Sequence, residues 1–157
     1  MSESVINLDD IDKLILNFLQ DDGKLTAKLL AEKIGLTQTP VYERIRKLER
    51  LGVIRKYVAL INPESVSKEL VIFMNLTLKD HGIGLRDRFL EKVSALPEVT
   101  ELYHTSGVYD FLAKVRVRDV HEYKDFLVEK MGKIDNVKDV VSHVVLEEIK
   151  RSTKIVL

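Results

Sequence analysis

Apolar residues in the first third of the chain recur three and four positions apart, which is the spacing of an amphipathic helix. The first expected helix covers residues 8–20. Asp9 and Asp10 stand at its start, where the helix dipole favours negative charge, and Gly23 is a suitable stop. Its apolar positions are Leu8, Ile11, Leu14, Ile15, Phe18 and Leu19. Such a stripe covers one face only, so the helix must pack against other elements of a small domain.

Two further helices are expected directly afterwards, joined by a short turn. Thr26 can cap the first, and Gly35 supplies the permissive backbone of the turn. Thr37 can cap the second, which carries Pro40 in its first turn and runs to Leu51. Their apolar positions are Ala27, Leu30, Ala31, Ile34, Val41, Ile45, Leu48 and Leu51. Two helices joined in this way, the second one basic, are typical of helix-turn-helix DNA binding, whereas the alternative is an ordinary helical hairpin with a solvated charged face.

The pattern changes after Gly52, where β-branched and aromatic residues dominate over residues 53–61. This stretch predicts a short wing or a connecting strand. Asn62 and Pro63 break it, so we expect a domain boundary there, with one domain over 1–62 and another over 63–157.

The second part of the chain contains a weak repeat of strand, helix and strand. Two such units give the order βαββαβ, the ferredoxin-like arrangement. The expected strands cover residues 70–78, 99–105, 109–117 and 137–147, and the expected helices cover 84–96 and 120–131. The fold class is therefore α+β, a winged helix-turn-helix followed by a ferredoxin-like domain. Such a sheet has helices on one face only, and its other face is expected to be too apolar for water, which favours a homodimer.

Charge is distributed unevenly, although the 157 residues carry no net charge. Residues 1–23 have one Lys against six acidic residues, whereas residues 24–56 have nine Lys or Arg against three Glu. The positive surplus coincides with the expected helix-turn-helix, where contacts with DNA phosphates are needed.

Composition excludes several other classes. The chain has no cysteine, which excludes disulfides and thiolate metal sites. No apolar run approaches the length of a membrane span and the N-terminus does not look like a secretory signal, so we expect no membrane and a cytoplasmic protein. The four His show no metal-ligand spacing, and His104, Ser106 and Asp110 lie too close together on one hairpin for a catalytic triad. We therefore expect no enzyme, no metal and no cofactor.

Residues near the start of the basic helix are the candidates for DNA contact. Gln38 and Thr39 lie where a recognition helix enters the major groove, and Gln can pair with adenine. Arg44, Arg46 and Lys47 can read guanine or neutralise phosphate. The alternative is that Arg44 or Arg46 pairs with a neighbouring Glu on the surface. The predicted set is Gln38, Thr39, Tyr42, Arg44, Arg46 and Lys47.

The segment from Thr105 to Asp110 joins the two central expected strands. One interpretation is a tight hairpin, with Gly107 at positive φ and Asp110 capping the turn. The other is a binding loop, because free backbone N–H groups near Gly107 can hold a carboxylate while Asp110 accepts from an ammonium group. Together these groups match the head group of an amino acid.

Three motifs in this order resemble the Lrp/AsnC family of bacterial and archaeal transcription regulators. The first runs from Leu8-Asp9-Asp10-Ile11-Asp12 to Gly23, and the second from Gly35 through Pro40, Arg44, Leu48 and Glu49 to Ile54. The third comprises Thr105, Gly107, Tyr109 and Asp110. The resemblance covers nearly the whole chain.

The resemblance implies a DNA-binding domain joined to an effector domain called the RAM domain. It also implies binding of double-stranded DNA, an amino acid or related small molecule as effector, and homodimers that assemble further, with an octamer expected. The effector site lies where this hairpin meets the last strand of a neighbouring subunit. Many members carry Thr-x-Thr in that strand, but this chain has Val140-Val141-Ser142, so one hydroxyl is replaced. The effector-binding set is Thr105, Ser106, Gly107, Tyr109, Asp110 and Ser142.

One rival function remains open from the sequence. A ferredoxin-like effector domain can work without DNA, as a small-molecule-binding or assembly protein. The basic segment over residues 24–56 argues against this rival.

Overall fold

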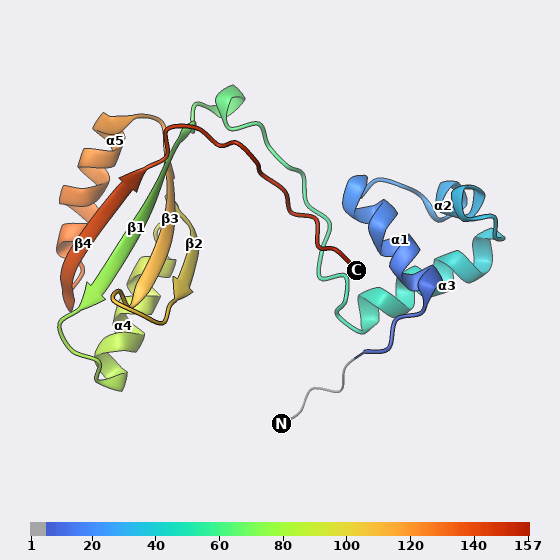
Figure 1. The fold of residues 1–157 in the computed structure, drawn as a ribbon, viewed down its shortest axis with the longest axis horizontal. Helices are drawn as coiled ribbons and strands as arrows, with labels where there is room; N and C mark the ends of the chain where they lie inside the picture. The colour runs from blue at the N-terminus through green and yellow to red at the C-terminus, as the bar shows by residue number, and fades with distance from the viewer. Residues whose placement is uncertain (1–5) are drawn as a thin grey trace. The chain divides into compact units, whose positions relative to one another are not determined.

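The computed structural model describes residues 6–157 and divides into two compact units (Figure 1). One unit contains the chain up to Leu60 together with the tail Lys150–Leu157, and the other contains Ile61–Ile149. The division into 1–62 and 63–157 stays a prediction about folding domains. The structure adds that the tail packs with the first unit.

Three helices form the first unit, as the hydrophobic spacing predicts. They are α1 (Asp10–Asp21), α2 (Ala27–Ile34) and α3 (Gln38–Arg50). The Asp9 side chain caps α1 and the Thr26 side chain caps α2, while Gly35 takes the left-handed conformation at φ 77°. Thr37 stands before α3 without a side-chain capping bond, so its predicted cap is wrong in that detail. The shared core contains Ile15, Leu16, Leu30, Ala31, Val41 and Leu48.

The predicted wing strand over residues 53–61 is wrong, because this segment is not assigned as a strand. The amides of Val53 and Ile54 bond instead to the Leu48 carbonyl, which folds the chain back on the end of α3. A strand needs a neighbouring strand to satisfy its backbone groups, and the described residues offer none here. High β propensity alone therefore did not decide the conformation.

The second unit has the expected order βαββαβ. Its strands are β1 (Leu70–Leu78), β2 (Val99–His104), β3 (Phe111–Val117) and β4 (Val137–Val144), and its helices are α4 (Ile83–Ser94) and α5 (Val120–Asp125). α5 continues as a π-helical turn, η2 (Phe126–Lys130), and a 3-10 turn, η3 (Met131–Lys133); a further 3-10 turn, η1 (Glu64–Val66), precedes β1. The sheet order is β2-β3-β1-β4 with every pair antiparallel, which confirms the ferredoxin-like arrangement (Figure 1).

Strand alternation separates the two faces of this sheet. On β1, Ile72, Met74, Leu76 and Leu78 are buried against helices, and on β3 the residues Phe111, Ala113, Val115 and Val117 are buried likewise. Phe89 and Val93 from α4 and Tyr123 and Phe126 from α5 and η2 join the same cluster, so both helices cover one face. The remaining strand side chains form an open face without helices.

The open face is less apolar than the sequence suggests. Lys114 Nζ lies 6.0 Å from the centre of the Phe73 ring and 3.2 Å from Glu101. The open face therefore carries a cation among its apolar side chains. Arg116 pairs with Glu148 at 3.1 Å. The face therefore combines half-buried apolar side chains with ion pairs.

Candidate DNA-binding face and effector site

The start of the recognition helix α3 is exposed. Gln38 and Thr39 occupy its first turn and Tyr42 follows one turn later, all with side chains in solvent. Thr39, Tyr42 and Arg46 are three and four residues apart, so they share one helix face. The structure thus brings four of the six predicted DNA contacts onto one accessible surface: Gln38, Thr39, Tyr42 and Arg46.

Arg46 is the most accessible cation of the predicted set. Its side chain is 66% exposed, and Nη1 lies 3.4 Å from Glu49 Oε2. This matches the surface pairing that the sequence left open for Arg46. A pair of this length and exposure is weak, so it does not prevent contact with a phosphate.

Arg44 and Lys47 project toward α1 instead. Arg44 Nη1 lies 2.6 Å from both Asp9 Oδ2 and Asp12 Oδ1, and Lys47 Nζ lies 3.2 Å from Asp12 Oδ2. Arg44 therefore does not pair with its neighbour Glu43, as the alternative supposed. The Asp9 and Asp12 carboxylates raise the pKa of Arg44, mainly through hydrogen bonds. Whether these two cations also contact DNA stays a prediction.

Asp9 takes part both in the cap of α1 and in the ion pairs between α1 and α3. Its Oδ1 accepts from the Asp12 amide at 2.8 Å and its Oδ2 accepts from Arg44. The backbone hydrogen bond from Asp12 and the Arg44 guanidinium lower the pKa of the Asp9 carboxyl. One residue therefore caps α1 and joins it to α3.

The hairpin between β2 and β3 has a closed base and an open tip. Thr105 N donates to Asp110 O, Thr105 Oγ1 donates to Tyr109 O, and Gly107 has φ 127°. Among the described residues, no hydrogen bond from the amides of Ser106, Gly107 or Val108 is found. The tip thus offers the backbone donors that binding of a carboxylate requires.

Asp110 has one carboxylate oxygen hydrogen-bonded to the backbone and the other near His81. Oδ2 accepts from the Leu78 amide at 2.8 Å, which fixes the side chain against the end of β1. Oδ1 lies 3.8 Å from His81 Nδ1. His81 was not part of the predicted effector set, since it follows β1 and its proximity arises only from the sheet order. No hydrogen bond to Oδ1, the outer oxygen of Asp110, is found among the described residues.

Ser142 lies on the helix-covered side of β4, opposite Met74 on β1. Its Oγ accepts a hydrogen bond from the Tyr123 hydroxyl of α5. β3 and β1 separate β4 from β2, so within one chain the structure does not bring Ser142 to the hairpin. Its expected role needs a neighbouring subunit and stays a prediction.

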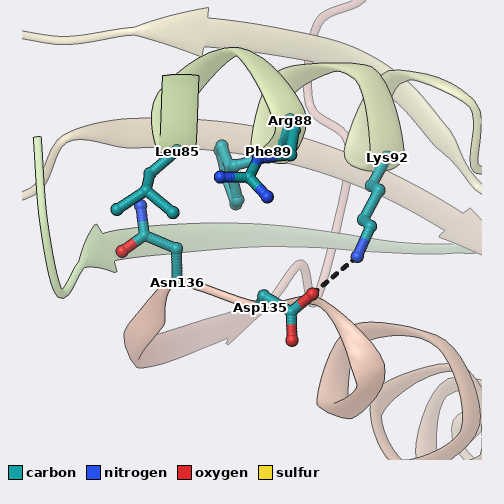
Figure 2. A pocket seen from close by; sticks show the side chains of 6 residues that line it. All are labelled: Leu85, Arg88, Phe89, Lys92, Asp135 and Asn136. Carbon is teal, nitrogen blue, oxygen red and sulfur yellow. Dashed lines mark hydrogen bonds and ion pairs between the residues drawn. The ribbon is translucent and has the colours of Figure 1, made fainter. Parts of the chain in front are cut away.

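A separate pocket of about 240 Å³ lies between α4 and the loop before β4. Figure 2 shows Arg88 beside Phe89, with Lys92 directed at Asp135. Lys92 and Asp135 pair at 2.7 Å, and the Asp135 side chain is 86% exposed. Because its carboxylate is already neutralised and in solvent, we do not assign the effector to this pocket.

No helix within residues 6–157 is both long and apolar enough to cross a membrane. The same residues contain no group of three or more His, Cys, Asp or Glu side chains placed to hold a metal ion.

Comparison with known proteins decides the family. Residues 71–155 match the Lrp/AsnC ligand binding domain, and residues 8–55 match a winged helix-turn-helix DNA-binding domain. The chain belongs to the Lrp/AsnC family. It is 38% identical over 151 residues to the leucine-responsive regulatory protein of Escherichia coli K12, covering 96% of this chain and 92% of that protein. The corresponding protein of Klebsiella pneumoniae is equally similar, at 38% identity over the same shares of both chains.

Solved structures of Lrp/AsnC proteins have the same fold. An AsnC family transcriptional regulator from Agrobacterium tumefaciens superposes with a TM-score of 0.91 at 40% identity, covering 94% of this chain and 96% of that one. A transcriptional regulator from Neisseria meningitidis, solved as a complex with L-Met, gives a TM-score of 0.91 at 32% identity, covering 95% and 96%. This Lrp/AsnC chain is thus a transcription regulator with a DNA-binding and a ligand-binding domain.

Proposed function

We propose that the protein binds operator DNA through α3 and that an amino acid, bound in the second unit, changes this binding. The observation that carries the proposal is the joining of an exposed basic recognition helix and a ligand-binding domain in one chain. The rival function, an effector-binding protein that does not bind DNA, does not explain the exposed face formed by Thr39, Tyr42 and Arg46.

Base contacts come from the first turns of α3. Gln38 has the paired donor and acceptor that recognise adenine in the major groove, and Arg46 supplies a cation for guanine or phosphate. Thr39 and Tyr42 lie beside them and add hydroxyl groups. Arg44 and Lys47, the other two members of the predicted set, bind Asp12 on α1 and are not assigned base contacts.

The effector is an amino acid held at the hairpin from Thr105 to Asp110. The amides of Ser106 and Gly107 bind its carboxylate, and the outer oxygen of Asp110 accepts from its ammonium group. Tyr109 lines the loop, and Ser142 of a neighbouring subunit completes the site. The L-Met complex of the Neisseria meningitidis relative supports this class of ligand.

Homodimers form through the open face of the sheet and assemble further, with an octamer as the expected state. Half-buried Phe73, Leu112 and Val141 supply the apolar area. The protein acts in the cytoplasm, where its DNA is, and is not an enzyme. The family membership supports this assignment.

A mobility-shift assay on the promoter region of the protein's own gene tests DNA binding. The proposal expects a shift that weakens steeply with added salt, because phosphate contacts release counterions. Absence of any salt-sensitive shift would support the rival instead. A thermal-shift screen over the twenty amino acids then identifies the effector, since a ligand that binds the folded state raises the melting temperature.

A further inference from the structure

Asp12 is the one buried charged side chain in the described part of the chain, with 0% of its surface exposed. Asp12 lies on the side of α1 that contacts the recognition helix α3. Both carboxylate oxygens are engaged by α3, Oδ1 by Arg44 at 2.6 Å and Oδ2 by Lys47 at 3.2 Å. A carboxylate in such a place is tolerated only when it is paired and hydrogen-bonded.

The two cations that satisfy Asp12 are three residues apart, so they stand on successive turns of one side of α3. A single carboxylate held between two turns fixes how far α3 slides along its axis and how far it rotates about it. Hydrophobic contacts among Val41, Leu48 and α1 are non-directional and constrain this rotation less.

Arg44 and the proposed reading face point in different directions. Arg44 is two residues from both Tyr42 and Arg46, which corresponds to about 200° around an α-helix of 3.6 residues per turn. When Tyr42 and Arg46 face DNA, Arg44 therefore faces α1. If Arg44 left Asp12 to bind a DNA phosphate, the buried carboxylate would lose its closest partner.

We infer that Asp12 is a positioning residue for DNA recognition, and that Arg44 and Lys47 serve Asp12 and not the phosphate backbone. The inference rests on the proposed DNA binding by α3. It divides the basic residues of one helix into two groups. Arg46 contributes to the salt dependence of binding, whereas Arg44 and Lys47 orient the helix that carries it.

The salt dependence of binding separates the two groups. Each phosphate contact contributes about 0.9 to the slope of log affinity against log salt concentration. Arg46→Gln in the full-length protein should lower that slope by about this amount on a promoter duplex. Arg44→Gln and Lys47→Gln should leave the slope at its wild-type value, and Arg46→Gln is their matched control on the same helix.

Asp12→Asn tests the positioning role directly, because it keeps the shape of the side chain and removes the charge that holds Lys47, while Arg44 keeps its pair with Asp9. Affinity for an unrelated duplex of equal length should rise and its salt slope should grow by up to about 0.9. The preference for the promoter duplex over the unrelated one should fall. A merely structural role would weaken binding to both duplexes alike, and that result would overturn the inference.

The double variant Asp12→Asn/Arg44→Gln is the control for loss of folding. It removes both members of the Asp12–Arg44 pair and leaves no buried charge unpaired. Circular dichroism and thermal melting establish that each variant is folded. A slope lowered equally by Arg44→Gln and Arg46→Gln, in folded protein, contradicts the inference while leaving DNA binding by α3 intact. Failure of the wild-type protein to bind in a salt-sensitive way contradicts the proposed function itself.

Discussion

The side-chain amide of Gln20 makes two hydrogen bonds with the backbone of Ile155. Gln20 Oε1 accepts from the Ile155 amide at 2.7 Å, and Nε2 donates to the Ile155 carbonyl at 3.1 Å. The neighbouring Lys154 pairs with Asp21 at 2.6 Å. The tail is therefore attached to the end of α1 by hydrogen bonds that no pattern in the sequence indicates.

Gln20→Ala should release this tail. Loss of the two hydrogen bonds removes about 1 kcal/mol of local stabilisation each, or less because they are exposed to water. Amide hydrogen exchange at Ile155 should become faster, while protection in the core of α3 stays unchanged. Asp21→Asn is the control, because its exposed ion pair contributes little. Unchanged exchange at Ile155 in Gln20→Ala would show that the tail is held by other contacts.

Tyr57 gives the first unit a dependence on alkaline pH. Its partial burial and its hydrogen bond to Glu49 raise the pKa of the phenol to about 12. An unfolded tyrosine ionises near about 10, so the stabilisation is fully present below that pH and is lost as the pH rises through about 12. Tyr57→Phe should remove from the tyrosinate absorbance a component centred near pH 12. If the difference titration between wild type and variant is centred near 10 instead, the contact with Glu49 does not persist in solution.

Asp110→Asn should abolish the response to an amino acid and preserve the fold. The amide oxygen can still accept from Leu78 N, but the negative charge that faces the ammonium group is gone. Gly107→Val should have a similar effect, because a β-branched residue is strained at φ 127° although space for its Cβ is available. Thermal-shift titration with the identified effector measures both. A full response in Asp110→Asn would place the effector elsewhere.

Phe73→Glu should separate the proposed dimer. Phe73 lies on the open face beneath Lys114, where burial of a carboxylate between two sheets is costly. Light scattering of the wild type should give at least twice the 18.0 kDa chain mass, and the variant should approach the single-chain value. The exposed Ile83 at the start of α4, on the helix-covered side of the sheet, changed to Glu, is the matched control for added charge. A wild-type monomer at micromolar concentration would remove the argument for pairing through this face.

Sequence periodicity predicts correctly those elements in which buried residues recur at a regular spacing. α1, α3 and β1 are of this kind, because alternation or helical spacing fixes which side is buried. The strand predicted over residues 53–61 does not form, because β propensity does not supply a pairing partner. The pairing of Asp12 with Arg44 and the proximity of His81 to Asp110 depend on tertiary packing across about 30 residues. Sequence alone gave no signal for His81, whereas Asp12 stood within the first family motif without an assigned role.

Regulation of DNA binding by an amino acid is tested by the affinity for the promoter duplex, measured with and without the amino acid that most raises the melting temperature. Linkage requires that an effector which changes DNA affinity by some factor has its own affinity changed by DNA by the same factor. We therefore expect fluorescence anisotropy to show a shifted DNA affinity at saturating effector, and calorimetry to show the equal change for the effector with DNA present. Identical DNA affinity with and without a bound amino acid would contradict the account of this protein as an amino-acid-responsive regulator.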